Sequence, residues 1–312
     1  MLLFVVRRVL GMVPLVLGAT FVIFAAVYAL PGDPIRAIAG PTAEISPATR
    51  AALTEEYHLD EPLLVQYWYY LTGVLRGDLG VDLRGVPVYD LVEAAWPVSL
   101  LLGLTAWALM AVVGVGLGTV AAMRRGGAFD WAVLGLTTVI VGVPYFVVAY
   151  VLQIMVGVQL GWLPSSGIRE GWPTSYVLPA ACLALFGLPE LSRLTRASII
   201  ENRQADFVDT ATAKGLAPRV ILVRHILRTS LVPVVSVLGL ALGFLMSGAI
   251  LVEGIFNVPG LGFTLFNGIR QQNGPVVVGI STLMVFIFLA INLLVDIVCG
   301  LLDPRISLVR DG

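Results

Sequence analysis

ENRQADFVDTATAKGLAPRVILVRHIL, residues 201–227, is the longest charged stretch in the second half of a chain that otherwise reads as apolar runs. Its apolar residues follow a spacing close to that of one helical face; they are Ile200, Phe207, Val208 and Ala211. Most of its charges fall off that face. A helix with this many charges does not insert into lipid, so it needs a surface to dock on. The alternative is a connecting loop that lies on lipid headgroups.

The same stretch contains a helix stop and a helix start. Gly215 follows Lys214, which predicts a helix end, because glycine accepts a left-handed backbone and a late cation suits the helix dipole. Pro218 suits the first turn of a second helix, where its missing N–H costs nothing. The sequence therefore predicts a helix, a glycine break and a second helix.

The composition of the chain is that of an integral membrane protein. Hydrophobic residues make up 58% of the 312 residues and charged residues only 12%, against about 25% charged in a soluble domain. The net charge of −1 and the lack of a basic patch give no indication of nucleic-acid binding. Cys182 and Cys299 stand in separate apolar runs, which predicts two small buried hydrophobes rather than a disulfide or a metal site.

Six apolar runs are candidate membrane spans, because about 20 helical residues cross a bilayer core of about 30 Å, although the fourth run is short for a span. They cover residues 9–31, 98–123, 131–158, 177–191, 231–252 and 275–301. Pro144 predicts a kink within the third run. The first run also resembles a signal peptide with a cleavage site near Ala29, but its length and the five runs that follow favour a retained span. We therefore expect an all-α integral membrane protein with six transmembrane helices.

The polar segment 32–97 follows the first span. Ser46 and Pro47 predict the start of a helix that runs to about Tyr57, and a second amphipathic helix is expected at 62–75. Four aromatic residues at 67–70 are typical of a membrane interface. Aromatic packing inside a small helical cap explains them equally well, and both interpretations stay open.

The distribution of charge predicts the orientation. The termini, the loop near residue 125 and the 190–228 region hold 13 basic and 7 acidic residues, whereas the opposite loops hold 6 basic and 12 acidic. Positive charge favours the cytoplasmic side, which predicts an N-in, C-in protein. The expected domains are the first transmembrane helix 1–31, the extracytoplasmic segment 32–97, a five-helix core 98–303 that carries the cytosolic loop 200–228, and the cytosolic tail 304–312.

The sequence lacks the residue patterns that ATP binding, proton-coupled transport and serine catalysis require. No G-x-x-x-x-G-K-[ST] motif occurs, so ATP, if it is used, binds to another polypeptide. Asp296 and Glu190 lie near span ends, which favours terminal or partner-facing charges over the midplane proton relay of a carrier. His58 and His225 lie outside the spans, and a serine in an outer loop has no membrane histidine to activate it. We predict no catalytic residue and no metal site.

Asp209-Thr210-Ala211, followed after three residues by Gly215, resembles the EAA loop of ATP-binding-cassette (ABC) importer permeases. The run 206–216, with Arg224-His225-Ile226-Leu227-Arg228 after it, is similar to the dipeptide/oligopeptide branch of that family. Five further stretches resemble that branch in the same order along the chain. They are residues 31–34 (PGDP), 59–80 with its LDEPL and GDLG, 160–167 (LGWLPSSG), 256–262 (FNVPGLG) and 302–306 (LDPRI).

The resemblance implies a first-type ("B") permease whose loop 200–228 couples to a cytosolic ATPase. The implied coupling residues are Asp206, Asp209, Thr210, Ala211, Lys214, Gly215 and Leu216. It also implies a loop that faces a binding protein, through Glu253, Phe256, Asn257, Pro259, Gly260 and Gly262. The implied location is the bacterial cytoplasmic membrane, in contact with lipid.

The implied partners are a second homologous permease, two cytosolic ATPases that carry ATP and Mg, and an extracytoplasmic substrate-binding protein. Di- or oligopeptides are the expected cargo, and nickel, haem or another small solute is the alternative within the same class. A stand-alone secondary carrier or channel is a second class of function, and a membrane scaffold without transport is a third.

Overall fold

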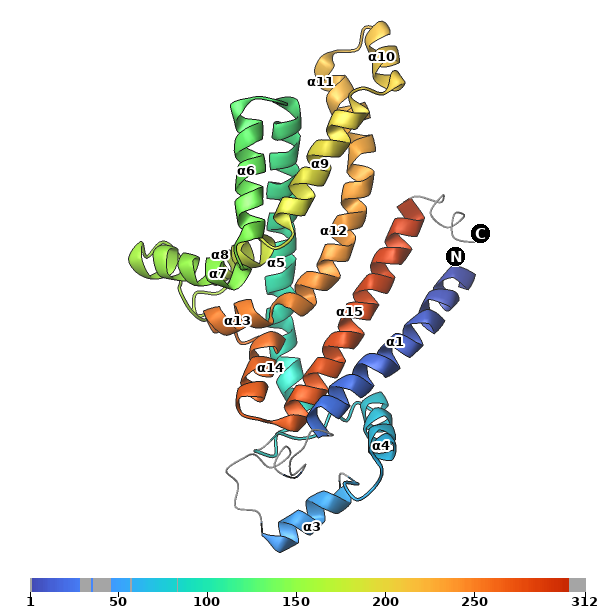
Figure 1. Ribbon diagram of the computed structural model, residues 1–312, viewed down its shortest axis with the longest axis vertical. Helices are drawn as coiled ribbons and strands as arrows, with labels where there is room; N and C mark the ends of the chain where they lie inside the picture. The colour runs from blue at the N-terminus through green and yellow to red at the C-terminus, as the bar shows by residue number, and fades with distance from the viewer. Residues whose placement is uncertain (1, 29–34, 36–45, 57, 83, 303–312) are drawn as a thin grey trace. The chain divides into compact units, whose positions relative to one another are not determined.

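The computed structural model describes the chain except residues 1, 29–34, 36–45, 57, 83 and 303–312 (Figure 1). The predicted tail 304–312 and the PGDP stretch 31–34 lie outside the described residues. The described chain is helical, with one isolated bridge between Val81 and Pro87. It divides into two compact units. Unit 1 is residues 1–100 with 246–312, and unit 2 is residues 101–245.

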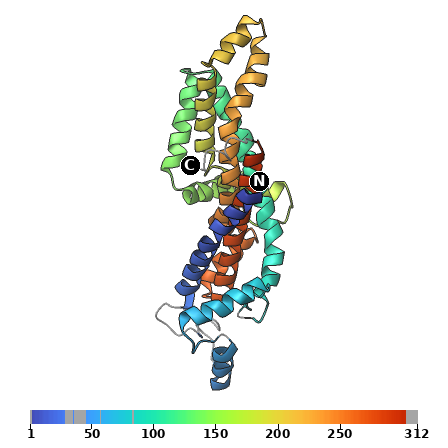
Figure 2. The ribbon, with the colours of Figure 1, turned by 90° about the vertical axis from the view of Figure 1, so that its right-hand side faces the viewer.

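Unit 1 is built around two long helices, α1 (Leu2–Tyr28) and α15 (Gly274–Leu302), which lie side by side in both views (Figures 1 and 2). The expected first and last spans are therefore present. The helices α3 (Pro47–Glu56) and α4 (Leu63–Leu75) begin where Pro47 and Pro62 predict a start. Tyr67 donates a hydrogen bond to the Leu17 carbonyl oxygen at 3.0 Å and belongs to the core between α1, α4 and α15. Packing inside this unit therefore explains Tyr67.

The remainder of unit 1 joins the start of α5 (Val88–Met123) to α13 (Ile250–Phe256), α14 (Leu261–Arg270) and α15. The second span was expected to begin after Pro97, but α5 begins ten residues earlier at Val88. A helix can continue through proline when neighbouring groups satisfy the freed carbonyl. The apolar side chains that pack together here are Leu79, Val88, Val92, Ala95, Leu261, Leu265, Val276, Ile280 and Met284.

In unit 2, two of the expected spans are each broken into two helices that the apolar runs do not resolve. The third run forms α6 (Ala128–Gly142) and α7 (Tyr145–Leu152), which continues into the π-helical turn η1 (Gln153–Gln159). The axes of the two parts differ by 103°, so the break at Pro144 is much sharper than the expected kink. The fourth run forms α8 (Thr174–Ala184) and α9 (Leu188–Asn202), bent by 65°. Pro189 therefore starts a helix, whereas the sequence placed it near a span end.

Among the described residues, four helices are long and apolar enough to cross a membrane without a break. They are 5–28, 88–123, 218–246 and 274–297. Three bent pairs also pass this test: α6 with α7 and η1, α8 with α9, and α13 with α14. Up to seven spans result if each pair is one span. Cys182 is buried in α8, as expected, and the side chain of Cys299 lies outside the described part.

Candidate coupling site

The predicted helix, break and second helix are all present in the 200–228 segment. They are α10 (Asp206–Ala213), the turn at 214–217, and α11 (Pro218–Val220), which continues through the π-helical turn η2 (Ile221–Leu227) into α12 (Arg228–Gly248). Asp206 and Asp209 lie in the first turn of α10, where the helix dipole favours negative charge. Both carboxylates are exposed to solvent.

Gly215 ends α10 through a defined hydrogen-bond pattern. Its φ is +74°, a left-handed conformation that costs a side-chain-bearing residue roughly 1–2 kcal/mol. The Leu216 N–H donates to the Ala211 carbonyl at 3.3 Å, and the Gly215 N–H donates to the Thr212 carbonyl at 2.9 Å. This pair of bonds is a Schellman motif. Pro218 then occupies the first turn of α11, as predicted.

Ala211 anchors α10 to unit 2. It is buried in a cluster formed with four other apolar residues from α5, α9 and η2, which are Ala122, Ile199, Ile221 and Ile226. The other six residues predicted for coupling (Asp206, Asp209, Thr210, Lys214, Gly215 and Leu216) are exposed. Phe207 is a correction to the predicted apolar face, since 37% of its surface is exposed while Val208 packs against the cluster. An eight-residue helix has only a narrow buried side, so Phe207 is left facing out.

The helices beneath α10 are tied to one another by polar contacts that the sequence does not reveal. Ser198 on α9 and Ser230 on α12 are both buried and hydrogen-bond to each other's carbonyl oxygens. Arg196 on α9 forms an ion pair with the buried carboxylate of Asp130 on α6, and its Nη2 lies 2.8 Å from Oδ2. The Gly126 N–H donates to the same carboxylate at 2.9 Å. α9 is thereby linked to both α6 and α12.

Close backbone packing adds a third link, between α5 and α9. A Cβ added to Gly118 would lie 2.5 Å from the Ser192 carbonyl oxygen and 2.7 Å from the Thr195 Cβ. Only glycine allows the two helices to come this close. The sequence gives no signal that shows which helix Gly118 meets.

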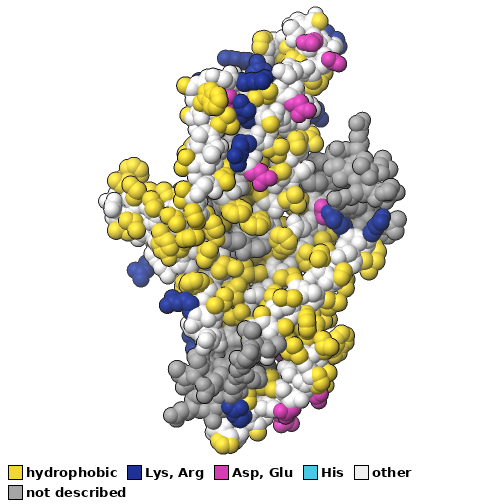
Figure 3. Space-filling model, viewed as in Figure 1, with side chains coloured by type: hydrophobic (Ala, Val, Ile, Leu, Met, Phe, Trp, Pro, Cys, Tyr) yellow, Lys and Arg dark blue, Asp and Glu magenta, His cyan; other side chains and the backbone are white. Residues whose placement is uncertain are grey.

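The charged and apolar surfaces of unit 2 are separate. In Figure 3, acidic and basic side chains gather at the end of unit 2 that carries α10, whereas hydrophobic side chains cover α7 and η1. The exposed apolar residues of this second region include Phe146, Val147, Tyr150, Val151, Ile154, Met155 and Val158. Exposed apolar residues on this scale mark a surface that faces lipid or a partner rather than water.

The second predicted site, at 253–262, is mostly interior. Glu253, Phe256, Gly260 and Gly262 are buried in unit 1, and a surface role for these four is a correction. The segment was expected to be a glycine-rich polar loop, but it forms α13, a turn and α14. Asn257, with φ +49°, and Pro259 are exposed on that turn.

Glu253 has a structural role in this turn. Its Oε1 accepts a hydrogen bond from the Ser99 hydroxyl at 2.6 Å, and its Oε2 accepts one from the Phe263 N–H at 2.9 Å. The Ser99 oxygen in turn accepts the Leu261 N–H at 2.8 Å. The carboxylate and the hydroxyl therefore satisfy backbone donors that the start of α14 would otherwise leave unpaired.

Comparison with known proteins identifies the family. Residues 114–308 match the binding-protein-dependent transport system inner membrane component family, and residues 1–85 match the N-terminal region of such membrane components. The chain belongs to this family. The permease is 35% identical over 311 residues to the dipeptide transport system permease protein DppB of Bacillus subtilis, and the match covers 99% of each chain.

Two further relatives match over nearly their full length. The permease is 35% identical to the glutathione transport system permease protein GsiC of Salmonella typhimurium and 34% identical to DppB of Escherichia coli, each time covering 98% of this chain and 99% of the relative. The permease is therefore a non-catalytic, multi-pass subunit of an ABC importer in the bacterial cytoplasmic membrane, and it works with ATPase and binding-protein partners.

Proposed function

We propose that this chain forms half of the translocation pathway for di- or oligopeptides, with a second related permease as the other half. An extracytoplasmic binding protein delivers the peptide, and two cytosolic ATPases, which hold ATP and Mg, drive its passage. The names of the relatives support a peptide cargo, since two transport dipeptides and one transports glutathione. Nickel, haem or another small solute is the alternative cargo.

The observation that carries the proposal is that α10 is exposed on one side and packed on the other side against the buried cluster that contains Ala211. Six of the seven residues predicted for coupling face solvent, while Ala211 is held in the cluster beneath them. Exposed Phe207 and Leu216 add apolar surface beside the carboxylates of Asp206 and Asp209. Such a small mixed surface suits a cleft in a partner protein, where an apolar anchor and complementary charges fix the fit.

Movement of α10 would be transmitted to the membrane-spanning helices through the side chains that pack beneath α10. A displacement of α10 acts on α9 and η2 through the buried cluster that contains Ala211. The Arg196–Asp130 ion pair and the Ser198–Ser230 hydrogen bonds then couple α9 to α6 and α12. Packed helices with discrete contacts of this kind move as bodies rather than deform. We infer that closure of the ATPases tilts these helices together.

The experiment uses the complete transporter in proteoliposomes, with ATP hydrolysis and peptide uptake measured on the same sample. Gly215→Pro cannot adopt φ +74° and breaks the cap of α10, and Asp209→Lys reverses a charge at its first turn. We expect at least a tenfold loss of peptide carried per ATP hydrolysed in each variant. Glu170→Lys, a charge reversal at an exposed residue of the 159–176 loop, is the matched control.

The outcomes separate the alternatives. Unchanged uptake and hydrolysis in both variants would mean that α10 has no coupling role. Uptake by the permease without ATPases would make it a stand-alone carrier. Uptake of labelled nickel or haem by the complete transporter, with no uptake of labelled peptide, would move the cargo to the alternative class.

We propose that the binding protein contacts the exposed turn at Asn257 and Pro259, because the other four residues predicted for this site are buried. A cysteine at Pro259 is expected to crosslink to the binding protein from the extracytoplasmic side, whereas a cysteine at Phe207 on α10 is expected to crosslink only to the ATPase. Labelling of the Pro259 position from the cytosol alone would contradict the N-in, C-in orientation.

A further inference from the structure

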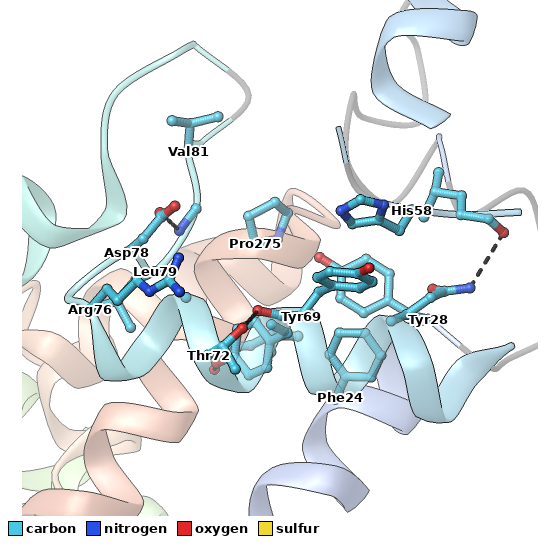
Figure 4. A pocket seen from close by; sticks show the side chains of 16 residues that line it. Phe24, Tyr28, His58, Tyr69, Thr72, Arg76, Asp78, Leu79, Val81 and Pro275 are labelled. Carbon is cyan, nitrogen blue, oxygen red and sulfur yellow. Dashed lines mark hydrogen bonds between the residues drawn. The ribbon is translucent and has the colours of Figure 1, made fainter. Parts of the chain in front are cut away.

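Unit 1 contains a cavity of about 320 Å³ between α4, the end of α1, the loop that follows α4 and the start of α15 (Figure 4). Ligand pockets span roughly 300–1,000 Å³, so this cavity suits a small molecule. Most of its lining residues belong to the segment 32–97, for which the sequence predicts an extracytoplasmic position. Neither the coupling site nor the turn at 257–259 contributes a residue to it.

One wall of the cavity is aromatic. The rings of His58 and Tyr69 stack with their centroids 3.9 Å apart. The Phe24 ring also lines the cavity, and its centroid lies 4.7 Å from that of Tyr28 and 5.3 Å from that of Tyr70. Tyr69 is half-exposed. Aromatic faces attract both apolar side chains and cations, so this wall accepts an apolar group and a nearby ammonium.

The facing wall carries one charge of each sign. Arg76 and Asp78 both line the cavity and both are exposed (Figure 4). Asp78 Oδ1 accepts the Gly80 N–H at 2.9 Å, which leaves its second oxygen open, and no ion pair to either residue occurs in the described part of the chain.

The loop that holds these two charges is fixed by its backbone. The Asp78 N–H donates to the Gly73 carbonyl at 3.0 Å, and Gly77 adopts φ +85°. A loop with such bonds holds its side chains in a defined place, which lowers the entropic cost of binding. The two charges are therefore presented to the cavity together.

We propose that this cavity binds the zwitterionic backbone of a short peptide, with Arg76 facing the carboxylate, Asp78 facing the ammonium and the Tyr69 wall receiving an apolar side chain. This inference rests on the proposed peptide cargo. A phosphate or a lipid headgroup of single negative charge would be repelled by Asp78. A di- or tripeptide carries a free ammonium and a free carboxylate on one molecule that is small enough for a cavity of about 320 Å³.

The test measures binding of the labelled dipeptide Ala-Phe to the assembled transporter in nanodiscs, without the binding protein and without ATP. Arg76→Gln is expected to weaken binding at least tenfold, and to leave the affinity of the C-amidated dipeptide unchanged. Asp78→Asn keeps the bond to the Gly80 N–H, and is expected to weaken binding to a similar degree while N-acetyl-Ala-Phe binds as before. Arg84→Gln, at an exposed arginine outside the cavity, is the control for charge.

The role of the aromatic wall is tested with one variant and one matched control. Tyr69→Leu removes a lining residue, whereas Trp68→Leu removes an exposed aromatic of the same helix that does not line the cavity. We expect weaker binding of Ala-Phe only in the first variant, and no difference between the two for Ala-Ala. This comparison separates the wall from a general effect on α4.

Three results would overturn the inference: no binding of Ala-Phe to the wild-type transporter, binding of Ala-Phe by the Arg76 and Asp78 variants that is as tight as by the wild type, or equal losses for the zwitterionic and the blocked dipeptides. These results are distinct from a failure of the proposed function. Peptide uptake by the complete system with no binding in the cavity would reject only the cavity. Binding in the cavity with no peptide uptake would reject the proposed cargo.

Discussion

Ser198 on α9 and Ser230 on α12 exchange two hydrogen bonds, each hydroxyl donating to the other's backbone carbonyl oxygen, at 3.0 and 3.2 Å. Both residues are buried. The pair joins the helix that enters the 200–228 segment to the helix that leaves it. If α10 moves as proposed, we expect these two hydrogen bonds to make both helices follow it together.

The first prediction concerns this serine pair. Ser198→Ala and Ser230→Ala each remove one buried hydrogen bond, with an expected cost of about 1 kcal/mol in the free energy of unfolding. We expect the double variant to lower peptide uptake per ATP several-fold, because α9 and α12 can then move separately. Thermal unfolding of the purified transporter measures the first effect and proteoliposome uptake the second.

The control for the serine pair is Ser236→Ala, at a half-buried serine of α12 whose hydroxyl donates to the Val232 carbonyl oxygen of the same helix. If this control and the double variant lose uptake equally, or if neither does, the pair is not the link between the helices.

The second prediction concerns the Asp130–Arg196 ion pair. Arg196→Ala leaves the carboxylate of Asp130 buried without its cation, and such a loss costs roughly 3–5 kcal/mol when a buried pair is broken. Asp130→Asn with Arg196→Gln removes both charges, and is expected to unfold at a higher temperature than Arg196→Ala alone. The melting temperature in detergent decides between them.

The same pair separates stability from coupling. The neutral double variant keeps hydrogen-bonding groups at both positions, so we expect it to assemble with the ATPases. It lacks the two-point attachment of the guanidinium, and less uptake per ATP is expected. A neutral double variant that is less stable than Arg196→Ala would show that the unpaired charge on Asp130 is not what destabilises Arg196→Ala.

The third prediction compares two glycines of α5. Gly118→Ala would bring a Cβ to 2.5 Å from the Ser192 carbonyl oxygen, whereas nothing lies within 4 Å of a Cβ at Gly116. Overpacking of a close helix contact costs typically about 1–3 kcal/mol. We expect Gly118→Ala to lower the melting temperature and Gly116→Ala to leave it unchanged or raise it. Equal effects would mean that α5 and α9 are not in close contact.

Local chemistry explains what the sequence predicts well. The end of α10 and the start of α11 depend on Gly215 and Pro218, whose backbone preferences act within a few residues. The starts of α3 and α4 depend in the same way on Pro47 and Pro62. The family follows from such local stretches as well, because they are read directly from the chain.

The direction of a helix and its long-range partners are not local. An apolar run from 131 to 158 predicts burial in lipid or protein, but its hydropathy is the same whether Pro144 bends the axis slightly or by 103°. Asp130 and Arg196 are 66 residues apart, and each reads alone as one more charge near a span end. Glu253 reads as a loop acid, although the turn that follows it folds back over its carboxylate.

The last prediction concerns Asp82 in the loop before α5. Its Oδ1 accepts the Arg84 and Val86 N–H groups at 2.7 and 2.9 Å, and its Oδ2 accepts Arg84 Nε at 3.1 Å. Burial alone would raise the pKa of Asp82, but these hydrogen bonds and the guanidinium outweigh it and hold the pKa below its ordinary value.

A lowered pKa in the folded state sets the direction of the pH dependence. Folding favours the carboxylate, so its contribution is complete above the pKa of the unfolded chain and is lost as the pH falls through the folded pKa of Asp82. Asp82→Asn is expected to cost about 1–2 kcal/mol at pH 7, and the difference from the wild type is expected to shrink on acidification. Hydrogen exchange of the Arg84 and Val86 amides, which bond to this carboxylate, follows the effect directly.

The control for Asp82 is Asp78→Asn, because Asp78 accepts the Gly80 N–H and forms no ion pair within the described part of the chain. Exchange at Arg84 and Val86 is expected to stay at its wild-type rate in this variant at every pH. The prediction would be wrong if the Arg84 and Val86 amides of the wild type kept the same protection from pH 7 down through the acid range. The same conclusion would follow if the Asp82→Asn variant matched the wild type at every pH.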